Sequence, residues 1–124
     1  MSSFDHKNIN ALLFGLSEDL AGELSKPLAK LCRSVDSVRE CLSTVAGSAA
    51  QIIFCGADTA VVSKLRETKP EAPIVVVSRH PEISGWLDSI EAGATDYCAA
   101  PFETAQVQWI LETSIRAAQV PASV

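Results

Sequence analysis

Short apolar runs separated by amphipathic stretches constrain the fold of this chain most. The clearest run is Ile74 to Val77, four consecutive β-branched residues, which is typical of a strand buried on both faces. Further strand-like runs occupy residues 11–14, 51–55 and 96–99. Apolar residues recur at helical spacing between these runs. The alternation predicts βαβ units and an α/β fold with a doubly wound parallel sheet.

The first helix is predicted to begin after Ser17, which has the features of an N-cap. Glu18 and Asp19 would occupy its first turn, where the helix dipole favours negative charge. Pro27 lies inside the apolar pattern, so we expect the helix to bend there or to restart after Lys26. The apolar face of this helix would be Leu20, Leu24, Leu28 and Leu31.

The region that follows predicts a short edge strand at residues 32–35 and a second helix. Asp36 or Ser37 is the expected cap of that helix, and Gly47 is its expected end. Its apolar residues would be Val38, Cys41, Leu42 and Val45.

Three further helices are predicted from apolar spacing. The fourth helix has Pro81 in its first turn and ends at Gly93. The expected core-facing residues of the three helices are, in turn, Val61, Val62 and Leu65; Ile83, Leu87 and Ile90; and Val107, Ile110, Leu111 and Ile115. Five strands with these connections predict a flavodoxin-like sheet of strand order 2-1-3-4-5 with helices on both faces.

Composition excludes several classes of function. The chain has 124 residues, enough for one domain with a core, and a net charge of −5. Nucleic acids and anionic membranes attract runs of Lys and Arg, and the chain has none, so neither is an expected direct partner. The polar N-terminus and the lack of a long apolar run predict neither a signal peptide nor a membrane span, and hence a cytoplasmic location.

The four cysteines give no support for a metal or redox motif. They are far apart in the sequence, form no CxxC pair and have no histidine at a ligand spacing. Free cysteines in a cytosolic chain usually act as small buried hydrophobic residues. We therefore expect no metal and no cofactor. The cysteines are Cys32, Cys41, Cys55 and Cys98.

The strand ends define the candidate site. In an open parallel sheet, ligands bind outside the carboxyl ends of the strands, where the strand order reverses. The residues expected there are Gly15, Leu16, Cys55, Gly56, Ser78, Ala99 and Ala100.

The segment from Pro73 to Phe102, PIVVVSRHPEISGWLDSIEAGATDYCAAPF, resembles the second half of a response-regulator receiver domain of the CheY-like family. Members of that family have Thr or Ser at the first strand end and Lys-Pro-Phe at the second. This chain has Ser78 at the family's spacing from Ala100, and Pro101-Phe102 follows. The resemblance extends over almost the whole chain and implies a disordered N-terminus at 1–8, a receiver-like domain at 9–118 and a tail or linker start at 119–124.

The resemblance also implies that the phosphorylation chemistry is missing. Receivers hold Mg²⁺ with a pair of acids, accept phosphate on an Asp and neutralise its charge with a Lys, because phosphoryl transfer depends on positioning and charge neutralisation. The acids align with Gly15 and Leu16, the acceptor with Cys55 and the lysine with Ala100. The prediction is a degenerate pseudo-receiver that acts without phosphorylation and is not an enzyme.

Alternatives remain open at the sequence level. One alternative is that Glu18 and Asp19 hold a metal in place of the lost acids, although the helix-capping interpretation is favoured. A second is a true phosphorelay receiver in which Asp58 accepts phosphate from a displaced position. A third is a redox sensor that uses Cys55. A fourth is a small-molecule sensor that uses the pocket left by the missing charged side chains.

The expected function is to bind protein. By resemblance, Ser78 and Tyr97 match the hydroxyl and the aromatic residue that couple phosphorylation to the output face, and the Ala100–Pro101 peptide is expected to be cis. Receivers often dimerise through the fourth helix, fifth strand and fifth helix, so a homodimer through that face is the first expected partner. Trp86, Trp109 and Tyr97 are candidate interface residues.

A fused output domain is the other expected partner. Degenerate receivers of this kind precede an ATPase, a transcriptional activator or an RNA-binding antiterminator domain. The sequence does not choose among these.

Overall fold

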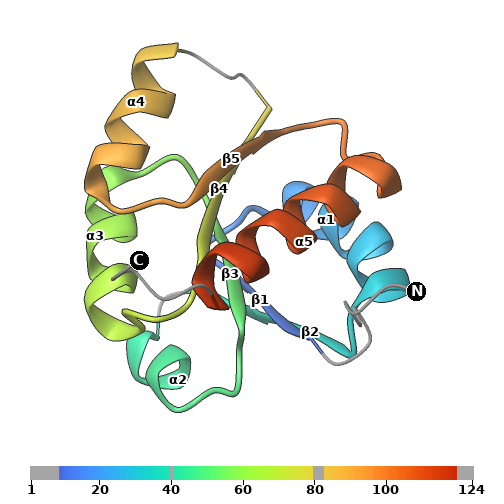
Figure 1. The fold of residues 1–124 in the computed structure, drawn as a ribbon, viewed down its shortest axis with the longest axis horizontal. Coiled ribbons are helices and arrows are strands. Elements are labelled where there is room, and N and C mark those ends of the chain that lie inside the picture. Colours follow the sequence, from blue (N-terminus) through green and yellow to red (C-terminus); the bar gives the residue numbers. More distant parts are fainter. Residues whose placement is uncertain (1–8, 40, 80–82, 120–124) are drawn as a thin grey trace.

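A computed structural model describes residues 9–39, 41–79 and 83–119. These residues form five strands and five helices in strict alternation (Figure 1). They are β1 (Asn10–Phe14), α1 (Glu18–Leu31), β2 (Ser34–Val38), α2 (Leu42–Ala46), β3 (Ile52–Cys55), α3 (Thr59–Thr68), β4 (Ile74–Ser78), α4 (Ile83–Ala92), β5 (Asp96–Ala99) and α5 (Thr104–Gln119). The predicted N-terminal and C-terminal tails fall largely on residues 1–8 and 120–124, outside the described ranges.

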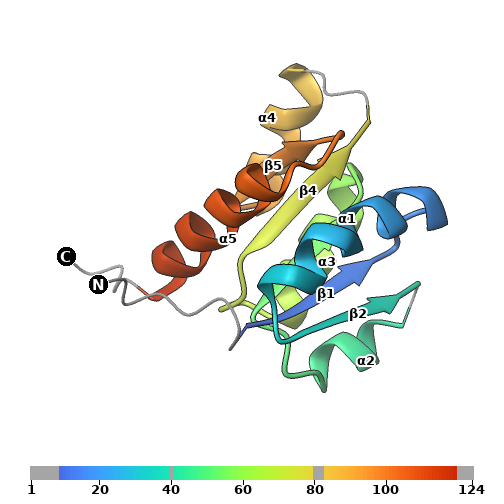
Figure 2. The same ribbon diagram turned by 90° about the vertical axis from the view of Figure 1, so that its right-hand side faces the viewer.

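All strand pairs are parallel, and the sheet order is β2-β1-β3-β4-β5. This confirms the predicted flavodoxin-like, CheY-like fold. The register pairs Phe14 with Cys55, and Ser78 with Ala99. The strands therefore end together at one edge of the sheet, which we call the carboxyl edge (Figure 2).

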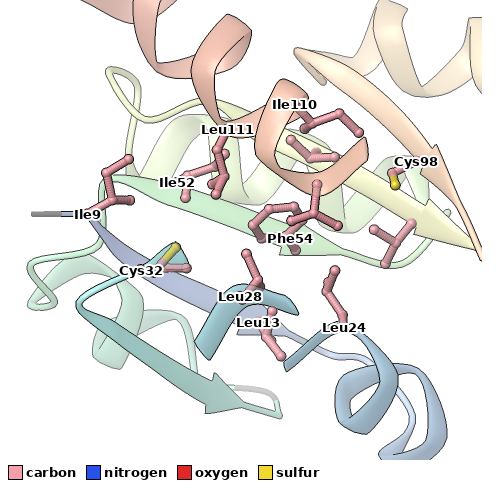
Figure 3. Close-up of a cluster of buried hydrophobic side chains, with 14 of the residues drawn as sticks. Ile9, Leu13, Leu24, Leu28, Cys32, Ile52, Phe54, Cys98, Ile110 and Leu111 are labelled. Carbon is pink, nitrogen blue, oxygen red and sulfur yellow. The ribbon is translucent and has the colours of Figure 1, made fainter. Parts of the chain in front are cut away.

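Alternating strand residues build two separate cores. One face of the sheet packs against α1 and α5, where Phe54 lies between Leu24 and Leu28 of α1 and Leu111 of α5 (Figure 3). The other face packs against α2 and α3 and includes Cys55. Each fully buried aliphatic side chain contributes about 1.5 to 3 kcal/mol, so these two cores supply most of the favourable free energy of folding.

Helix α1 begins as predicted. The Ser17 hydroxyl accepts a hydrogen bond from the Leu20 N–H at 3.3 Å, which confirms the capping interpretation. The helix then continues to Leu31 without a restart at Lys26. Pro27 is buried within it, so the packing of that face outweighs the lost backbone hydrogen bond.

The predictions for β2 and α2 were partly wrong. The strand occupies Ser34–Val38, so Asp36 and Ser37 lie inside it and cap no helix. All five residues pair with β1, and this pairing overrides the preference of Asp and Ser for helix caps. Helix α2 has only five residues and follows Cys41 as its N-cap. Gly47 ends it as predicted.

The predicted core face of α4 was also wrong. Leu87 is 50% exposed and Ile90 38% exposed, whereas Ser89 is buried. The helix packs mainly on α3, and its Ala92 contacts the α2–α3 side of the core. Two small residues of α4, Ser89 and Ala92, therefore face inward. The predicted role of Pro81 lies outside the described residues.

A polar network around Arg66 closes the opposite, amino edge of the sheet. The Arg66 guanidinium donates hydrogen bonds at 2.7 to 3.1 Å to the backbone carbonyls of Pro70, Ala72 and Gly93. Gly93 has a φ of +123°, a region that side chains disfavour. Arg66 thus joins the end of α3 to the turns that precede β4 and β5.

None of the helices in the described part of the chain is long and apolar enough to cross a membrane.

Candidate functional site

The loop after β1 carries two of the predicted site residues. Gly15 has a φ of +65°, and its N–H donates to the Val38 carbonyl at 2.8 Å, which ties β1 to β2 at the carboxyl edge. Leu16 is partly buried and packs toward the α1–α5 core. Neither residue has a side-chain oxygen, so neither offers a side-chain ligand to a hard cation.

Cys55 ends β3 and is fully buried. Its side chain belongs to the core on the α2–α3 side. Burial, helped by the nearby Asp58 carboxylate, raises the pKa of the Cys55 thiol to about 12. The thiolate is the reactive form of cysteine, so this environment opposes the redox-sensor alternative.

Asp58 is the N-cap of α3. Its Oδ1 accepts hydrogen bonds from the N–H groups of Ala60 at 3.0 Å and Val61 at 3.4 Å. Asn, Asp and Ser are the residues that most favour this position. The carboxylate therefore has a structural role at the start of α3.

Ser78, Ala100 and Tyr97 lie together on the β4–β5 side of the carboxyl edge. The Ala100 N–H donates to the Ser78 carbonyl at 2.9 Å, and the Ala100–Pro101 peptide is cis, as predicted. Tyr97 is partly buried and packs toward the α2–α3 side of the core. Ala100 has no charged group, so its side chain brings no positive charge to this edge.

Two exposed ion pairs at the carboxyl edge were missed by the sequence interpretation. Arg39, directly after β2, pairs with Glu18 at 3.1 Å, and both side chains are more than 80% exposed. Arg79, directly after β4, pairs with Glu23 of α1. Each arginine follows its strand by one residue, which is the signal that could have drawn attention to it.

No set of three or more His, Cys, Asp or Glu side chains within residues 9–39, 41–79 and 83–119 is grouped closely enough to hold a metal ion. Glu18 instead pairs with Arg39, and Asp19 is exposed in the first turn of α1. These positions fit the capping interpretation of the acidic pair rather than the metal alternative.

Two cavities open beside the end of β1, with volumes of about 310 and 480 Å³. Gly15 and Arg39 line both of them. The smaller is also lined by Phe14, Leu42, Val61 and Lys64, and the larger by Leu16, Ser17 and Glu18. Cys55, Ser78 and Ala100 line neither cavity. Both hollows therefore lie beside the end of β1, and the Cys55 side chain reaches neither of them.

The candidate interface residues are distributed over three elements. Trp86 of α4 is 44% exposed and Trp109 of α5 is 63% exposed. Trp86 and Ile90, four residues apart, lie on one side of α4. Strand β5, which carries Tyr97, lies between the two helices in both views (Figures 1 and 2).

Comparison with known proteins gives matches only at the level of structure. No protein-family model and no curated protein matches the sequence. The structure is similar to NtrX from Brucella abortus, with 17% identity and a TM-score of 0.79 over 89% of this chain and 27% of NtrX. This chain therefore spans about a quarter of NtrX.

Two other solved structures are similar over most of both chains. The beryllofluoride-activated NtrC4 receiver domain dimer has 15% identity and a TM-score of 0.75 over 88% of this chain and 98% of its own. A response regulator from Burkholderia pseudomallei, with a phosphorylated aspartic acid, a calcium ion and citrate, has 20% identity and a TM-score of 0.73 over 90% of this chain and 71% of its own. At such identities the likeness establishes architecture. The chain has the fold of a response-regulator receiver domain.

Proposed function

We propose that this chain is an atypical receiver domain that signals through protein contacts without being phosphorylated. The observation that carries the proposal is the buried, uncharged Cys55 at the end of β3. A phosphoacceptor must be reachable by a phosphodonor and must have cations beside it. Cys55 meets neither requirement, and it has no carboxylate to phosphorylate.

The surroundings of Cys55 support the same conclusion. The similar regulator from Burkholderia pseudomallei has a phosphorylated aspartic acid and a calcium ion. In this chain the aligned metal-ligand positions are Gly15 and Leu16, and the aligned lysine position is Ala100. A phosphoryl group on β3 would therefore lack the charge neutralisation that stabilises it.

Phosphorylation can be tested by incubating the protein with acetyl phosphate and Mg²⁺ and measuring the intact mass. We expect no added phosphoryl group. Stoichiometric phosphorylation that disappears in Asp58→Asn would overturn the proposal in favour of a displaced acceptor. Asn keeps the helix-capping hydrogen bonds, so this variant separates the chemistry from the fold. Asp19→Asn is the matched control, because it removes an exposed carboxylate at the same edge.

We further propose that the partner, either a second copy or an output domain, binds the face formed by α4, β5 and α5. Exposed Trp86, Leu87 and Ile90 on α4 support this, because aromatic and aliphatic side chains on one helix side favour interfaces. NtrC4 supplies a precedent for the second copy, since its activated receiver domain is a dimer.

Analytical ultracentrifugation of the wild type and of Trp86→Ser with Leu87→Ser tests the homodimer. We expect a concentration-dependent dimer that weakens at least about tenfold in the double variant, because interface energy concentrates in a few large side chains. Lys30→Ser on α1 is the control outside this face. A monomer at all concentrations would remove the homodimer and leave an output domain as the partner.

A further inference from the structure

We propose that the smaller cavity, which we call the β1 cavity, binds a small amphipathic anion, meaning a phosphate or carboxylate joined to an apolar group. The cavity lies between the end of β1, the side chains of Arg39 and Leu42, and α3, and its volume is about 310 Å³. That volume is at the lower end of the range for ligand sites.

The apolar part of the site is built from three elements. Phe14 ends β1, Leu42 begins α2 and Val61 lies on α3. All three side chains also pack in the core on the α2–α3 side. Because the core holds these side chains in place, the apolar surface exists before a ligand arrives and little ordering is needed on binding.

The charged part of the site consists of Arg39 and Lys64. None of the six described residues that line the cavity is acidic. Two cations above an apolar surface favour a ligand with an anionic head and an apolar body. Arg39 is especially suited to phosphate or carboxylate, because its planar guanidinium can form two parallel hydrogen bonds.

Glu18 is the competitor that a ligand must displace. Its carboxylate accepts one hydrogen bond from Arg39 at 3.1 Å, and both side chains are highly exposed. An exposed pair of this kind is weak, and arginine has five N–H donors. A ligand anion that also contacts Lys64 and the apolar surface therefore has more favourable contacts with the cavity than Glu18 has.

One side of the site is tied to the sheet by a backbone hydrogen bond. The Gly15 N–H donates to the Val38 carbonyl at 2.8 Å, which joins the turn after β1 to the residue before Arg39. The site is separate from Cys55, which lines neither cavity. A failure of this inference would therefore leave the proposed absence of phosphorylation intact.

The test is a titration followed by ¹H–¹⁵N NMR with four probes. Phenyl phosphate and benzoate are the amphipathic anions, inorganic phosphate has the charge without the apolar group, and benzyl alcohol is neutral. We expect saturable shifts at the amides of Gly15, Arg39 and Leu42 with phenyl phosphate or benzoate, and a dissociation constant on the order of 1 mM. Inorganic phosphate and benzyl alcohol should bind at least about tenfold more weakly, because each lacks half of the contacts.

The variant Arg39→Ala with Lys64→Ala should weaken phenyl phosphate binding about tenfold or more. Arg33→Ala with Lys30→Ala makes the same change in charge away from the cavity and should leave binding unchanged. All four side chains are exposed, so the spectra should show an intact fold. Absence of saturation, equal binding of inorganic phosphate, or equal loss in the control variant would each overturn the inference.

Discussion

The two edges of the sheet differ in the partners that their arginine side chains bind. At the amino edge, Arg66 forms hydrogen bonds with backbone carbonyls in the turns that precede β4 and β5. At the carboxyl edge, Arg39 and Arg79 form exposed ion pairs with acids of α1. Loss of hydrogen bonds that satisfy backbone groups lowers the free energy of unfolding substantially, whereas loss of an exposed ion pair changes it little. The fold therefore depends on the amino edge, which leaves the carboxyl edge free to change its chemistry.

The largest expected effect concerns thiol reactivity at the carboxyl edge. Hydrogen bonds, first from the Ser43 side chain and then from Thr44, lower the pKa of the exposed Cys41 thiol to about 7, whereas burial raises the pKa of Cys55 to about 12. Only the thiolate reacts, and its fraction falls tenfold for each pH unit below the pKa. At neutral pH, iodoacetamide should modify Cys41 more than about a thousandfold faster than Cys55.

Peptide mass spectrometry after timed quenching measures both rates. The Cys41 rate should rise with pH and level off above its pKa, near pH 7, while Cys55 stays unmodified in the native protein. Cys55 should react only after unfolding in urea, which serves as the positive control. Comparable rates at the two sites would show that the end of β3 is open to reagents, and the proposed absence of phosphorylation would lose the buried Cys55 on which it rests.

An acidic residue in place of Cys55 should strongly destabilise the protein. Cys55→Asp places a carboxylate in the α2–α3 core without a cation beside it, which should cost about 3 to 5 kcal/mol at pH 7. The buried carboxyl should have a raised pKa, so the folded state of the variant favours the neutral carboxyl. The loss should therefore shrink as the pH falls toward the carboxyl's unfolded pKa of about 4.

Urea denaturation of Cys55→Asp at pH 7 and pH 5 measures this effect. Cys55→Ala is the control for lost packing and should cost roughly 1 kcal/mol at both pH values. An Asp variant as stable as the wild type at pH 7 would show that this edge still accommodates a charge.

At the amino edge, Arg66→Ala should cost about 2 to 3 kcal/mol, because it leaves several backbone carbonyls without their charged donor. Arg66→Lys should cost less, since lysine keeps the charge but lacks the planar array of donors. The free energy of unfolding from urea titration gives both values. A loss below about 0.5 kcal/mol in the Ala variant would remove the proposed difference between the edges.

Gly93→Ala should cost about 1 to 2 kcal/mol. The residue has a φ of +123°, and an added Cβ would lie 3.2 Å from Cγ of Arg66. Gly22→Ala is the matched control, because it lies within α1 and an added Cβ there meets nothing within 4 Å. That control should stabilise the protein by up to about 1 kcal/mol, so opposite signs in thermal unfolding are the expected result.

Sequence patterns predicted the central elements because their signals are local. Two segments show this. The β-branched run at Ile74–Val77 identifies a buried strand, and the spacing of Val107, Ile110 and Leu111 identifies the buried side of a helix. The end of β2 was predicted too early, because Asp36 and Ser37 read as helix caps while pairing with β1 decided the outcome. The inward face of α4 was also missed. The orientation of α4 depends on its packing against α3, and the sequence of α4 alone holds no information on that packing.

The candidate site also has a part that the sequence could predict and a part that it could not. The proposed loss of the acids and the lysine, at Gly15, Leu16, Cys55 and Ala100, rests on the resemblance to the receiver motif, which the sequence contains. The sequence does not predict the cavity lined by Arg39 and Lys64, because these residues are 25 positions apart and meet only through the fold. Arg66 was missed for a related reason, since its partners are backbone carbonyls that have no sequence signature.

The smallest expected effect on stability is at Arg39. Arg39→Ala breaks the exposed pair with Glu18 and should change the free energy of unfolding by less than about 0.5 kcal/mol, because water and salt screen such pairs. A double-mutant cycle with Glu18→Ala isolates the coupling between the two side chains. A coupling above about 1 kcal/mol would mean that the carboxyl edge also supports the fold. A small coupling, together with the loss of phenyl phosphate binding expected when Arg39 and Lys64 are both replaced, would assign Arg39 to ligand binding, in contrast to the structural role of Arg66.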